Sequence, residues 1–317
     1  MRSLSFWWLI TCVACTQATD TDTDTDEETD TETDEDTDTD PSDDVVWVER
    51  SVETSKTLNA VYTGGTGAWV FGDDGGAWML NQGSAQPIET SVGDSLRGLW
   101  GQGDNGSETL TVVGFSGNVL SVNGDMSTSI TDIGTANLNA VDGVATDLVA
   151  VGRAGIYRYK ENDWAFEGAG FGNALNDVYV GALGTFAVGD GGSILEFSNG
   201  DWVQVTTPYT RNLFGIDGSD SVVWAVGEKG TVLKFDGGEW ISVDSAVQEN
   251  LWSVWVSDNG VPFIVGSGGT ALTLQDELIQ PLNTGLSMNL YSVWGSAENN
   301  VWAVGNRGTI LRYKGGN

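Results

Sequence analysis

Three aspartates, Asp142, Asp177 and Asp217, are the residues of this sequence best placed for acid–base chemistry. Each lies on or beside one of the repeated segments described below. Two carboxylates at a set separation are sufficient for glycoside hydrolysis, in which one is the general acid and the other the base or nucleophile. An aspartate that is solvated or bonded within a turn has the same appearance in a sequence, and we adopt that structural interpretation. The carboxylate pair is kept as the enzymatic alternative.

Composition excludes several other kinds of catalytic site. The chain has no histidine, and so lacks the commonest general base and metal ligand. Its two cysteines, Cys12 and Cys15, lie at the extreme N-terminus, which leaves the rest of the chain without a disulfide, a thiolate nucleophile or a Cys/His zinc site. A sialidase would need three arginines around a carboxylate, and only Arg97 falls on a predicted innermost strand. We therefore predict no catalytic residue, no metal site and no cofactor.

A set of seven residues is a candidate for ligand binding. Each follows a leucine that begins a repeated segment, so rotational symmetry between the repeats would place them in a ring at one depth near the axis. The members are Asn59, Arg97, Asn139, Asn176, Phe214, Trp252 and Tyr291. An arc of three aromatic rings beside amide and guanidinium donors would suit a glycan or a protein loop. The alternative is that the aromatic rings only fill space between the repeats.

The element that must position these residues is a sequence repeat. An apolar run, then Gly-x-x-Gly, then a second apolar run occurs seven times, at intervals of 37 to 42 residues. The first glycines are Gly72, Gly114, Gly152, Gly189, Gly227, Gly266 and Gly305. The motif predicts a two-residue hairpin turn whose glycines allow positive φ or close backbone approach. Each copy has room for four short strands, and four strands in a unit of this length are typical of a β-propeller blade.

The two ends of the chain complete one repeat between them. The last copy stops at Asn317, before a fourth strand, whereas residues 45–49 (VVWVE) form a strand-like segment ahead of the first copy. Trp47 precedes Leu58 by 11 residues, the same interval that separates Trp164 from Leu175. The sequence therefore predicts an all-β, seven-bladed propeller of four-stranded blades over residues 45–317, with the N-terminal strand closing the last blade.

Two further positions of each first strand indicate how the blades pack. The second residue after the leucine is small or short, as an innermost strand near a crowded axis requires; these residues are Ala60, Gly98, Ala140, Asp177, Gly215, Ser253 and Ser292. Large residues two positions further on are predicted to pack between blades; they are Tyr62, Trp100, Tyr179, Trp255 and Trp294.

The repeat resembles those of two known groups of propellers. The segment VWAVGNRGTIL, at 301–311, is similar to the repeats of photosystem II assembly factors of the plant and cyanobacterial propeller type. Asp236-Gly237-Gly238-Glu239-Trp240 and the turn before Trp202 resemble shortened Asp-box (BNR) turns of sialidase-like propellers. They lack the extra residue before the tryptophan and the hydroxyl residue of the full Asp-box. The resemblance covers residues 45–317 and implies the fold more than a function.

Residues 1–14 are predicted to be an export signal. Arg2 is followed by an apolar stretch of about 12 residues, whereas a membrane-spanning helix takes roughly 20. The stretch ends in Thr11-Cys12-Val13-Ala14-Cys15. A small residue directly before a cysteine resembles a bacterial lipobox, which implies that Cys15 is the lipidated first residue of the mature protein. Cys12 is the alternative processing site, although Thr11 suits it poorly.

Residues 15–44 are predicted to be a disordered acidic tether. Between Asp20 and Asp44 there are 15 acidic residues and no Lys or Arg. A segment with so few apolar side chains and one sign of charge cannot bury enough surface to offset the entropy of ordering. Residues 45–317 carry 30 acidic against 12 basic residues, and this excess argues against a nucleic-acid partner.

The function predicted from these features is non-enzymatic recognition. We expect a monomeric module, displayed on the outer membrane of a cell envelope by a lipid anchor, that binds a protein or a glycan. Two alternatives are an assembly factor for an envelope complex, which the resemblance implies, and a glycoside hydrolase that uses a carboxylate pair.

Overall fold

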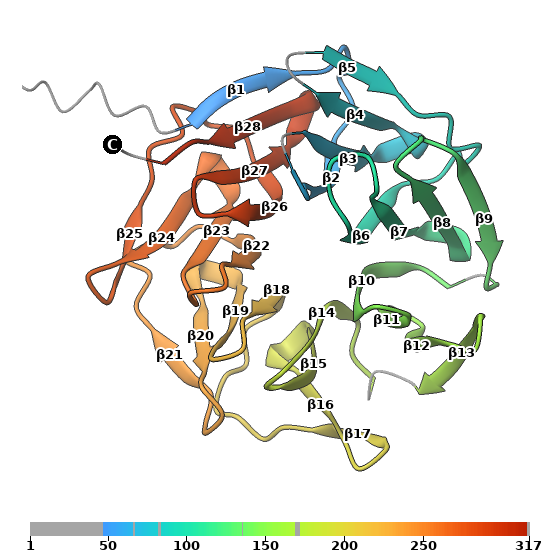
Figure 1. Ribbon diagram of the computed structural model, residues 1–317. Helices are drawn as coiled ribbons and strands as arrows, with labels where there is room; N and C mark the ends of the chain where they lie inside the picture. Colours follow the sequence, from blue (N-terminus) through green and yellow to red (C-terminus); the bar gives the residue numbers. More distant parts are fainter. Residues whose placement is uncertain (1–46, 66, 82–83, 135, 169–171, 316–317) are drawn as a thin grey trace, which may run out of the picture. The chain divides into compact units, whose positions relative to one another are not determined.

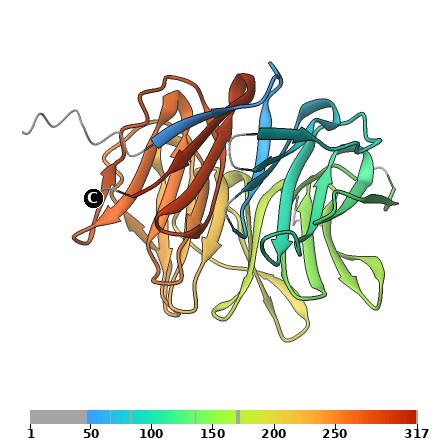
Figure 2. The same ribbon diagram turned by 45° about the horizontal axis from the view of Figure 1, so that its top comes forward.

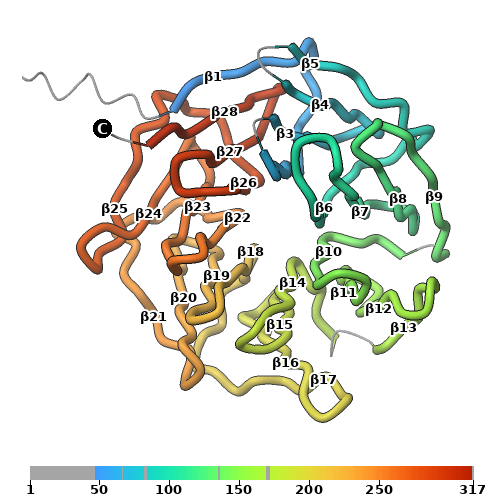
Figure 3. The backbone as a smooth tube through the Cα atoms, in the orientation of Figure 1, coloured from blue at the N-terminus to red at the C-terminus, as the bar shows by residue number. Residues whose placement is uncertain are grey.

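The computed structural model describes residues 47–65, 67–81, 84–134, 136–168 and 172–315. The predicted export signal, Cys15 and the acidic tether lie outside the described residues. The described chain forms seven four-stranded antiparallel sheets that surround one axis (Figures 1 and 3). The prediction of a seven-bladed propeller is therefore confirmed. None of the helices in these residues is both long and apolar enough to cross a membrane.

Strands follow the chain from the axis outward in each of the first six blades. Blades 1 to 3 contain β2 (Leu58–Tyr62), β3 (Ala68–Gly72), β4 (Ala77–Asn81), β5 (Ser84–Pro87); β6 (Leu96–Gln102), β7 (Thr109–Gly114), β8 (Asn118–Asn123), β9 (Thr128–Asp132); and β10 (Leu138–Val144), β11 (Asp147–Gly152), β12 (Gly155–Lys160), β13 (Asp163–Gly168). Blades 4 to 6 contain β14 (Leu175–Gly181), β15 (Gly184–Gly189), β16 (Ile194–Ser198), β17 (Asp201–Gln204); β18 (Leu213–Gly218), β19 (Val223–Gly227), β20 (Val232–Phe235), β21 (Ile241–Val243); and β22 (Leu251–Val256), β23 (Pro262–Gly266), β24 (Ala271–Gln275), β25 (Leu278–Pro281).

Blade 7 is built from both ends of the propeller. It contains β26 (Leu290–Ala297), β27 (Asn300–Gly305), β28 (Thr309–Tyr313) and, as its outermost strand, β1 (Trp47–Ser51). Strand β1 pairs with β28 from Trp47 opposite Tyr313 to Ser51 opposite Thr309, and Figures 1 and 2 show the two strands side by side. The Trp47 and Tyr313 rings lie 5.3 Å apart, and Trp47 is buried. The predicted ring closure is confirmed: the described strand runs from Trp47 to Ser51, two residues beyond the expected end at Glu49, and Val45 and Val46 lie outside the described residues.

At the first glycine of each Gly-x-x-Gly, the backbone of the same blade lies too close to leave room for a side chain. Gly227 has extended backbone, and a Cβ there would lie 2.1 Å from the carbonyl oxygen of Asn212. The other six first glycines meet the equivalent carbonyl at 1.9 to 2.4 Å. The second glycine has positive φ, as at Gly230 (φ 69°), where a short 3-10 turn connects the strands. These turns are η1 (Asp73–Gly75), η2 (Phe115–Gly117), η3 (Asp190–Gly192), η4 (Glu228–Gly230), η5 (Ser267–Gly269) and η6 (Asn306–Gly308).

Large aromatic side chains join neighbouring blades, as predicted. The hydroxyl of Tyr62 donates to the carbonyl of Gly103 in blade 2 at 3.0 Å, and the indole of Trp100 donates to Gly143 in blade 3 at 2.7 Å. Tyr62 also lies against Trp294 of blade 7, with 5.8 Å between ring centres. These rings bury apolar area and satisfy their own polar atoms, so they fix each blade against the next.

Candidate functional site

The seven predicted ring residues all occupy β-bulges. In every blade the pairing between the innermost strand and its neighbour shifts by one residue directly after the leucine that begins the innermost strand, as between Leu138 and Ala140 or between Leu213 and Gly215. The residue at the shift is Asn59, Arg97, Asn139, Asn176, Phe214, Trp252 or Tyr291. A bulge leaves its extra residue out of the ladder and redirects the side chain. The leucine before it is fully buried in each blade, which holds the bulge in place.

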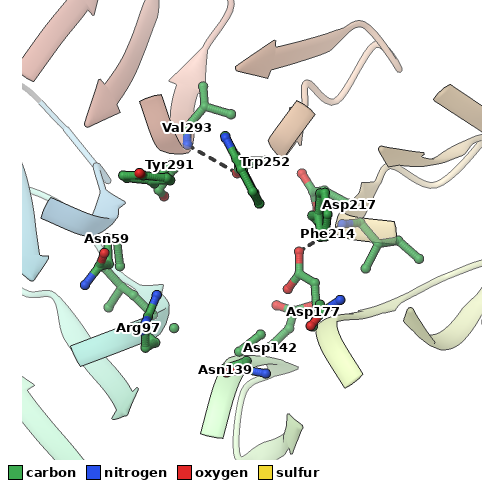
Figure 4. A pocket seen from close by; sticks show the side chains of 18 of the residues that line it. Asn59, Arg97, Asn139, Asp142, Asp177, Phe214, Asp217, Trp252, Tyr291 and Val293 are labelled. Carbon is green, nitrogen blue, oxygen red and sulfur yellow. Dashed lines mark hydrogen bonds between the residues drawn. The ribbon is translucent and has the colours of Figure 1, made fainter. Parts of the chain in front are cut away.

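These seven side chains line one axial cavity. An outer part of about 510 Å³ is bounded by all seven, together with Thr57 and Asp73. An inner part of about 140 Å³ is bounded by the same seven and by deeper residues of the innermost strands, among them Asp142, Asp177 and Asp217. Figure 4 shows Asn59 and Arg97 on the opposite side of this space from Phe214 and Asp217. The expected ring near the axis is therefore present, whereas its binding of a ligand stays a prediction.

The asparagine side chains of the ring have a defined orientation. The amide nitrogen of Asn139 donates to the Leu175 carbonyl of the next blade at 2.8 Å. Asn59 and Asn176 donate in the same way to Leu96 and Leu213, at 3.0 and 2.8 Å. A carbonyl can only accept, so the nitrogen must face it and the amide oxygen must face away. One N–H group of each amide therefore joins neighbouring blades and is not available to a ligand. The expectation of amide donors is limited to the second N–H of Asn139, which has no acceptor among the described residues.

The amide oxygens are the polar groups that the asparagines leave available. Among the described residues, no donor bonds the side-chain oxygen of Asn59, Asn139 or Asn176. The second hydrogen of Asn59 goes to Asp73 at 3.0 Å, and that of Asn176 goes to Asp190 at 3.1 Å. Asp73 and Asp190 were missed in the sequence, although both directly follow the first glycine of a Gly-x-x-Gly motif. This part of the cavity wall therefore presents hydrogen-bond acceptors.

The three aromatic residues form a continuous arc along the opposite wall. Phe214 and Trp252 stack with 4.6 Å between ring centres, and Trp252 and Tyr291 lie 5.8 Å apart at a tilt. All three are half-buried, so they contact one another and still line the cavity. The indole nitrogen of Trp252 donates to the hydroxyl of Ser267 at 2.9 Å, which fixes the plane of the ring. The rings thus join neighbouring blades and also offer an apolar surface to a ligand.

Arg97 supplies the one basic side chain that lines this cavity among the described residues. Its guanidinium lies 4.7 Å from the centre of the Phe115 ring, and the side chain is exposed. The four ion pairs of the described residues involve Lys56, Arg158 and Lys229 but leave Arg97 out. A cation held over an aromatic face keeps its charge available to a ligand.

The three aspartates brace neighbouring innermost strands. Asp142 accepts from the amide of Val180 at 2.6 Å, Asp177 from Ile216 at 2.9 Å, and Asp217 from Val256 at 2.7 Å. In each case the donor belongs to the next blade, so these carboxylates satisfy amides at the free edge of an innermost strand. The structural interpretation of the aspartates therefore agrees with their bonding, and an enzymatic role stays untested.

Burial in the cavity disfavours the charged form of these carboxylates. It raises the pKa of Asp142 and of Asp177 to about 7, against the opposing effect of the backbone hydrogen bonds. Burial also raises the pKa of Asp217 well above its ordinary value, and repulsion from Asp142 adds to this effect. The described residues contain no group of three or more His, Cys, Asp or Glu side chains arranged to hold a metal ion.

Two solved structures of the propeller YCF48 have the same architecture as this chain. "YCF48 bound to D1 peptide" superposes with a TM-score of 0.67 at 16% identity, over 85% of this chain and 97% of that chain. YCF48 from Cyanidioschyzon merolae gives 0.67 at 14% identity, over 84% and 98% of the two chains. This chain has the fold of the YCF48 propellers.

The likeness to YCF48 concerns the fold and extends to other propellers. The WD40 propeller domain of Doa1 superposes with a TM-score of 0.66 at 12% identity, over 84% of this chain and 96% of that domain. No family model and no curated protein sequence matches the chain. The resemblance to propellers of the photosystem II assembly-factor type is thus supported by the fold of YCF48, and the resemblance to Asp-box propellers stays a prediction.

Proposed function

We propose that this protein is a non-catalytic recognition module that binds an extended segment of a partner protein in its axial cavity. The observation that carries the proposal is the convergence of all seven bulge residues on one cavity, where they supply an aromatic arc, acceptor oxygens and a free guanidinium. A concave site with apolar walls and a few oriented polar groups is the usual form of a binding pocket. The YCF48 structure with a D1 peptide supports a peptide as the class of ligand.

The proposal includes the place of the protein in the cell. An export signal, a lipid on Cys15 and an acidic tether over residues 15–44 would hold the propeller at the surface of the outer membrane. These residues lie outside the described part of the chain, and the support is the sequence pattern alone. Assembly of an envelope complex is one setting in which such a module would act, and the YCF48 fold supports it.

Selection of peptides by the full-length protein tests the proposed pocket. A random peptide library is displayed on phage and selected against the wild-type protein, and the enriched peptides are then measured against Trp252→Ala. Loss of the indole removes the centre of the aromatic arc, so we expect affinity to fall at least tenfold, or about 1.4 kcal/mol. Phe166→Ala is the matched control, because Phe166 is 57% exposed on β13 and lies outside the cavity.

Two results would contradict the proposed binding of a peptide in this pocket. One is that peptides enriched on the wild-type protein bind Trp252→Ala with unchanged affinity. The other is that the library yields no specific peptide, while a glycan array gives a signal that depends on Trp252. The second result would retain the cavity and change the class of ligand. Fractionation of Cys15→Ala with membranes, together with palmitate labelling of that variant, would contradict Cys15 as the lipidated residue.

A further inference from the structure

The axial cavity has an uneven distribution of charge. Asp142, Asp177 and Asp217 come from three consecutive blades and line the inner part of the cavity, while Arg97 lies on the other side (Figure 4). The hydrogen-bond donors that reach the three carboxylates are neutral backbone amides. No Lys or Arg among the described residues forms an ion pair with any of them. An ionised carboxylate on this side therefore has no cationic partner among the described residues.

A cation in the inner cavity would relieve two unfavourable effects at once. The first is the desolvation of the carboxylates, and the second is the repulsion between them, which acts on Asp217 from Asp142 and on Asp177 from Asp142. An opposite charge close to a buried carboxylate favours its ionised form. Tyr179, which also lies close to Asp142 and Asp217, is neutral and cannot replace such a cation.

The walls above the carboxylates are also suited to a basic side chain. The oxygens of Asn139 and Asn176 can accept hydrogen bonds, because no donor among the described residues reaches them and the bonds of their nitrogens to Leu175 and Leu213 fix the orientation of the two amides. The arc of Phe214, Trp252 and Tyr291 offers ring faces, and aromatic faces attract ammonium and guanidinium groups. The inner cavity of about 140 Å³ resembles in size an engineered cavity of roughly 150 Å³ that admits a single benzene ring, so it takes one side chain and no more.

We propose that the partner inserts one lysine or arginine side chain through the aromatic arc into the inner cavity, where it meets Asp142, Asp177 and Asp217. This inference rests on the proposed function and specifies the chemistry of the ligand. Arg97 at the mouth disfavours a second basic residue beside the first, so the favoured segment has an isolated basic residue and not a basic run.

Defined peptides test the inference on the full-length protein. The probes are acetyl-Gly-Gly-Arg-Gly-Gly-amide, its Lys and Glu equivalents, and a citrulline peptide that keeps the shape of arginine without its charge. Affinities are measured by calorimetry and ligand-observed NMR. We expect the better basic peptide to bind about tenfold more tightly than the citrulline peptide. A tenfold difference in affinity lies between the contribution of a solvent-exposed ion pair and that of a partly buried ion pair.

Variants assign that preference to the carboxylates. Asp177→Asn and Asp142→Asn keep an oxygen for the amide of the next blade but remove the charge, and each should reduce the preference for the basic peptide over citrulline. Near-ultraviolet circular dichroism establishes whether each variant is folded. Two variants are made so that the test can still be carried out if one of them does not fold. Arg97→Gln should increase the preference for the basic peptide, because it removes a like charge from the cavity. Binding of the basic peptide should also tighten between pH 6 and pH 8, because the carboxylates must lose their protons.

The inference is overturned if neither basic peptide binds more tightly than citrulline, if the Glu peptide binds best, or if the preference survives in both aspartate variants. Its failure can be told apart from failure of the proposed pocket. Library peptides that depend on Trp252 but contain no basic residue would overturn the basic side chain alone. Library peptides that are indifferent to Trp252 would remove the pocket itself.

Discussion

The carboxylate of Asp177 in blade 4 accepts a 2.9 Å hydrogen bond from the backbone amide of Ile216 in blade 5. Asp177 thus binds the next innermost strand while lining the axial cavity. Asp142 and Asp217 repeat this contact on either side, with Val180 and Val256. The cavity and the junctions between blades therefore share the same side chains, so a substitution at these positions changes the cavity wall and the contact between blades together.

The raised pKa of Asp177 makes the stability of the propeller depend on pH. Its pKa is about 7 in the folded protein, against an ordinary value of 3.8 for an aspartate, so the folded state holds more protons between these limits. The free energy of unfolding therefore falls as pH rises from about 4 to about 7. The Asp177→Asn variant has no carboxyl group to titrate at this position. Its free energy of unfolding, measured relative to that of the wild type, should therefore be higher at pH 8 than at pH 5 by on the order of 2 kcal/mol.

Urea denaturation at the two pH values measures this effect. Asp276→Asn is the control, because Asp276 is exposed on the loop after β24 and has positive φ, which asparagine accepts. An equal difference from wild type at pH 5 and pH 8 for Asp177→Asn would refute the assignment.

Asn139 is expected to stabilise the junction between blades 3 and 4. Asn139→Ala removes the donor to the Leu175 carbonyl and should lower the free energy of unfolding by about 1–3 kcal/mol. Asn139→Asp should cost more than alanine, since it places an acceptor against an acceptor. Asn299→Ala, at an exposed position, should change stability by no more than about 0.5 kcal/mol. The contact has no energetic importance if aspartate and alanine prove equivalent at position 139.

Gly227 tests the close approach of strands within a blade. In Gly227→Ala the new Cβ would lie 2.1 Å from the Asn212 oxygen, so the backbone must shift, and we expect a loss of about 3 kcal/mol or more. Gly238→Ala is the matched control, since the nearest atom to its Cβ is a side-chain oxygen of Asp236 at 3.6 Å. Thermal unfolding of the two variants gives the comparison, and similar midpoints would mean that the strands separate without cost.

Trp47 tests the closure of the ring. Trp47→Ala removes a buried ring from the β1–β28 pair and should cost about 3–5 kcal/mol. Trp47→Phe should cost much less, because the indole nitrogen is buried without a hydrogen-bond partner among the described residues. Denaturant titration of both variants separates ring packing from polar burial. A small effect of alanine would show that β1 adds little to blade 7.

Much of the architecture follows from the repeat alone. The seven copies determine the number of blades, and the shared interval from Trp47 to Leu58 and from Trp164 to Leu175 determines how β1 completes blade 7. These features are readable because strand periodicity and turn chemistry are local, and because rotation relates equivalent positions in every blade. The same symmetry placed the seven cavity residues at one depth before any contact was known.

The chemistry of the cavity was decided by contacts between blades. The sequence presents Asn139 as a possible donor to a ligand, but the carbonyl of Leu175 takes one of its two N–H groups and so fixes which way the amide faces. Asp177 reads as an isolated acidic residue, but the fold sets it in the cavity wall near Asp142, where burial raises its pKa to about 7. Neighbours 36 residues or more apart along the chain determine both outcomes, and a sequence does not specify which atoms of such partners face each other. The residues of the site were therefore given by the repeat, and their donors, acceptors and charges only by the closed ring.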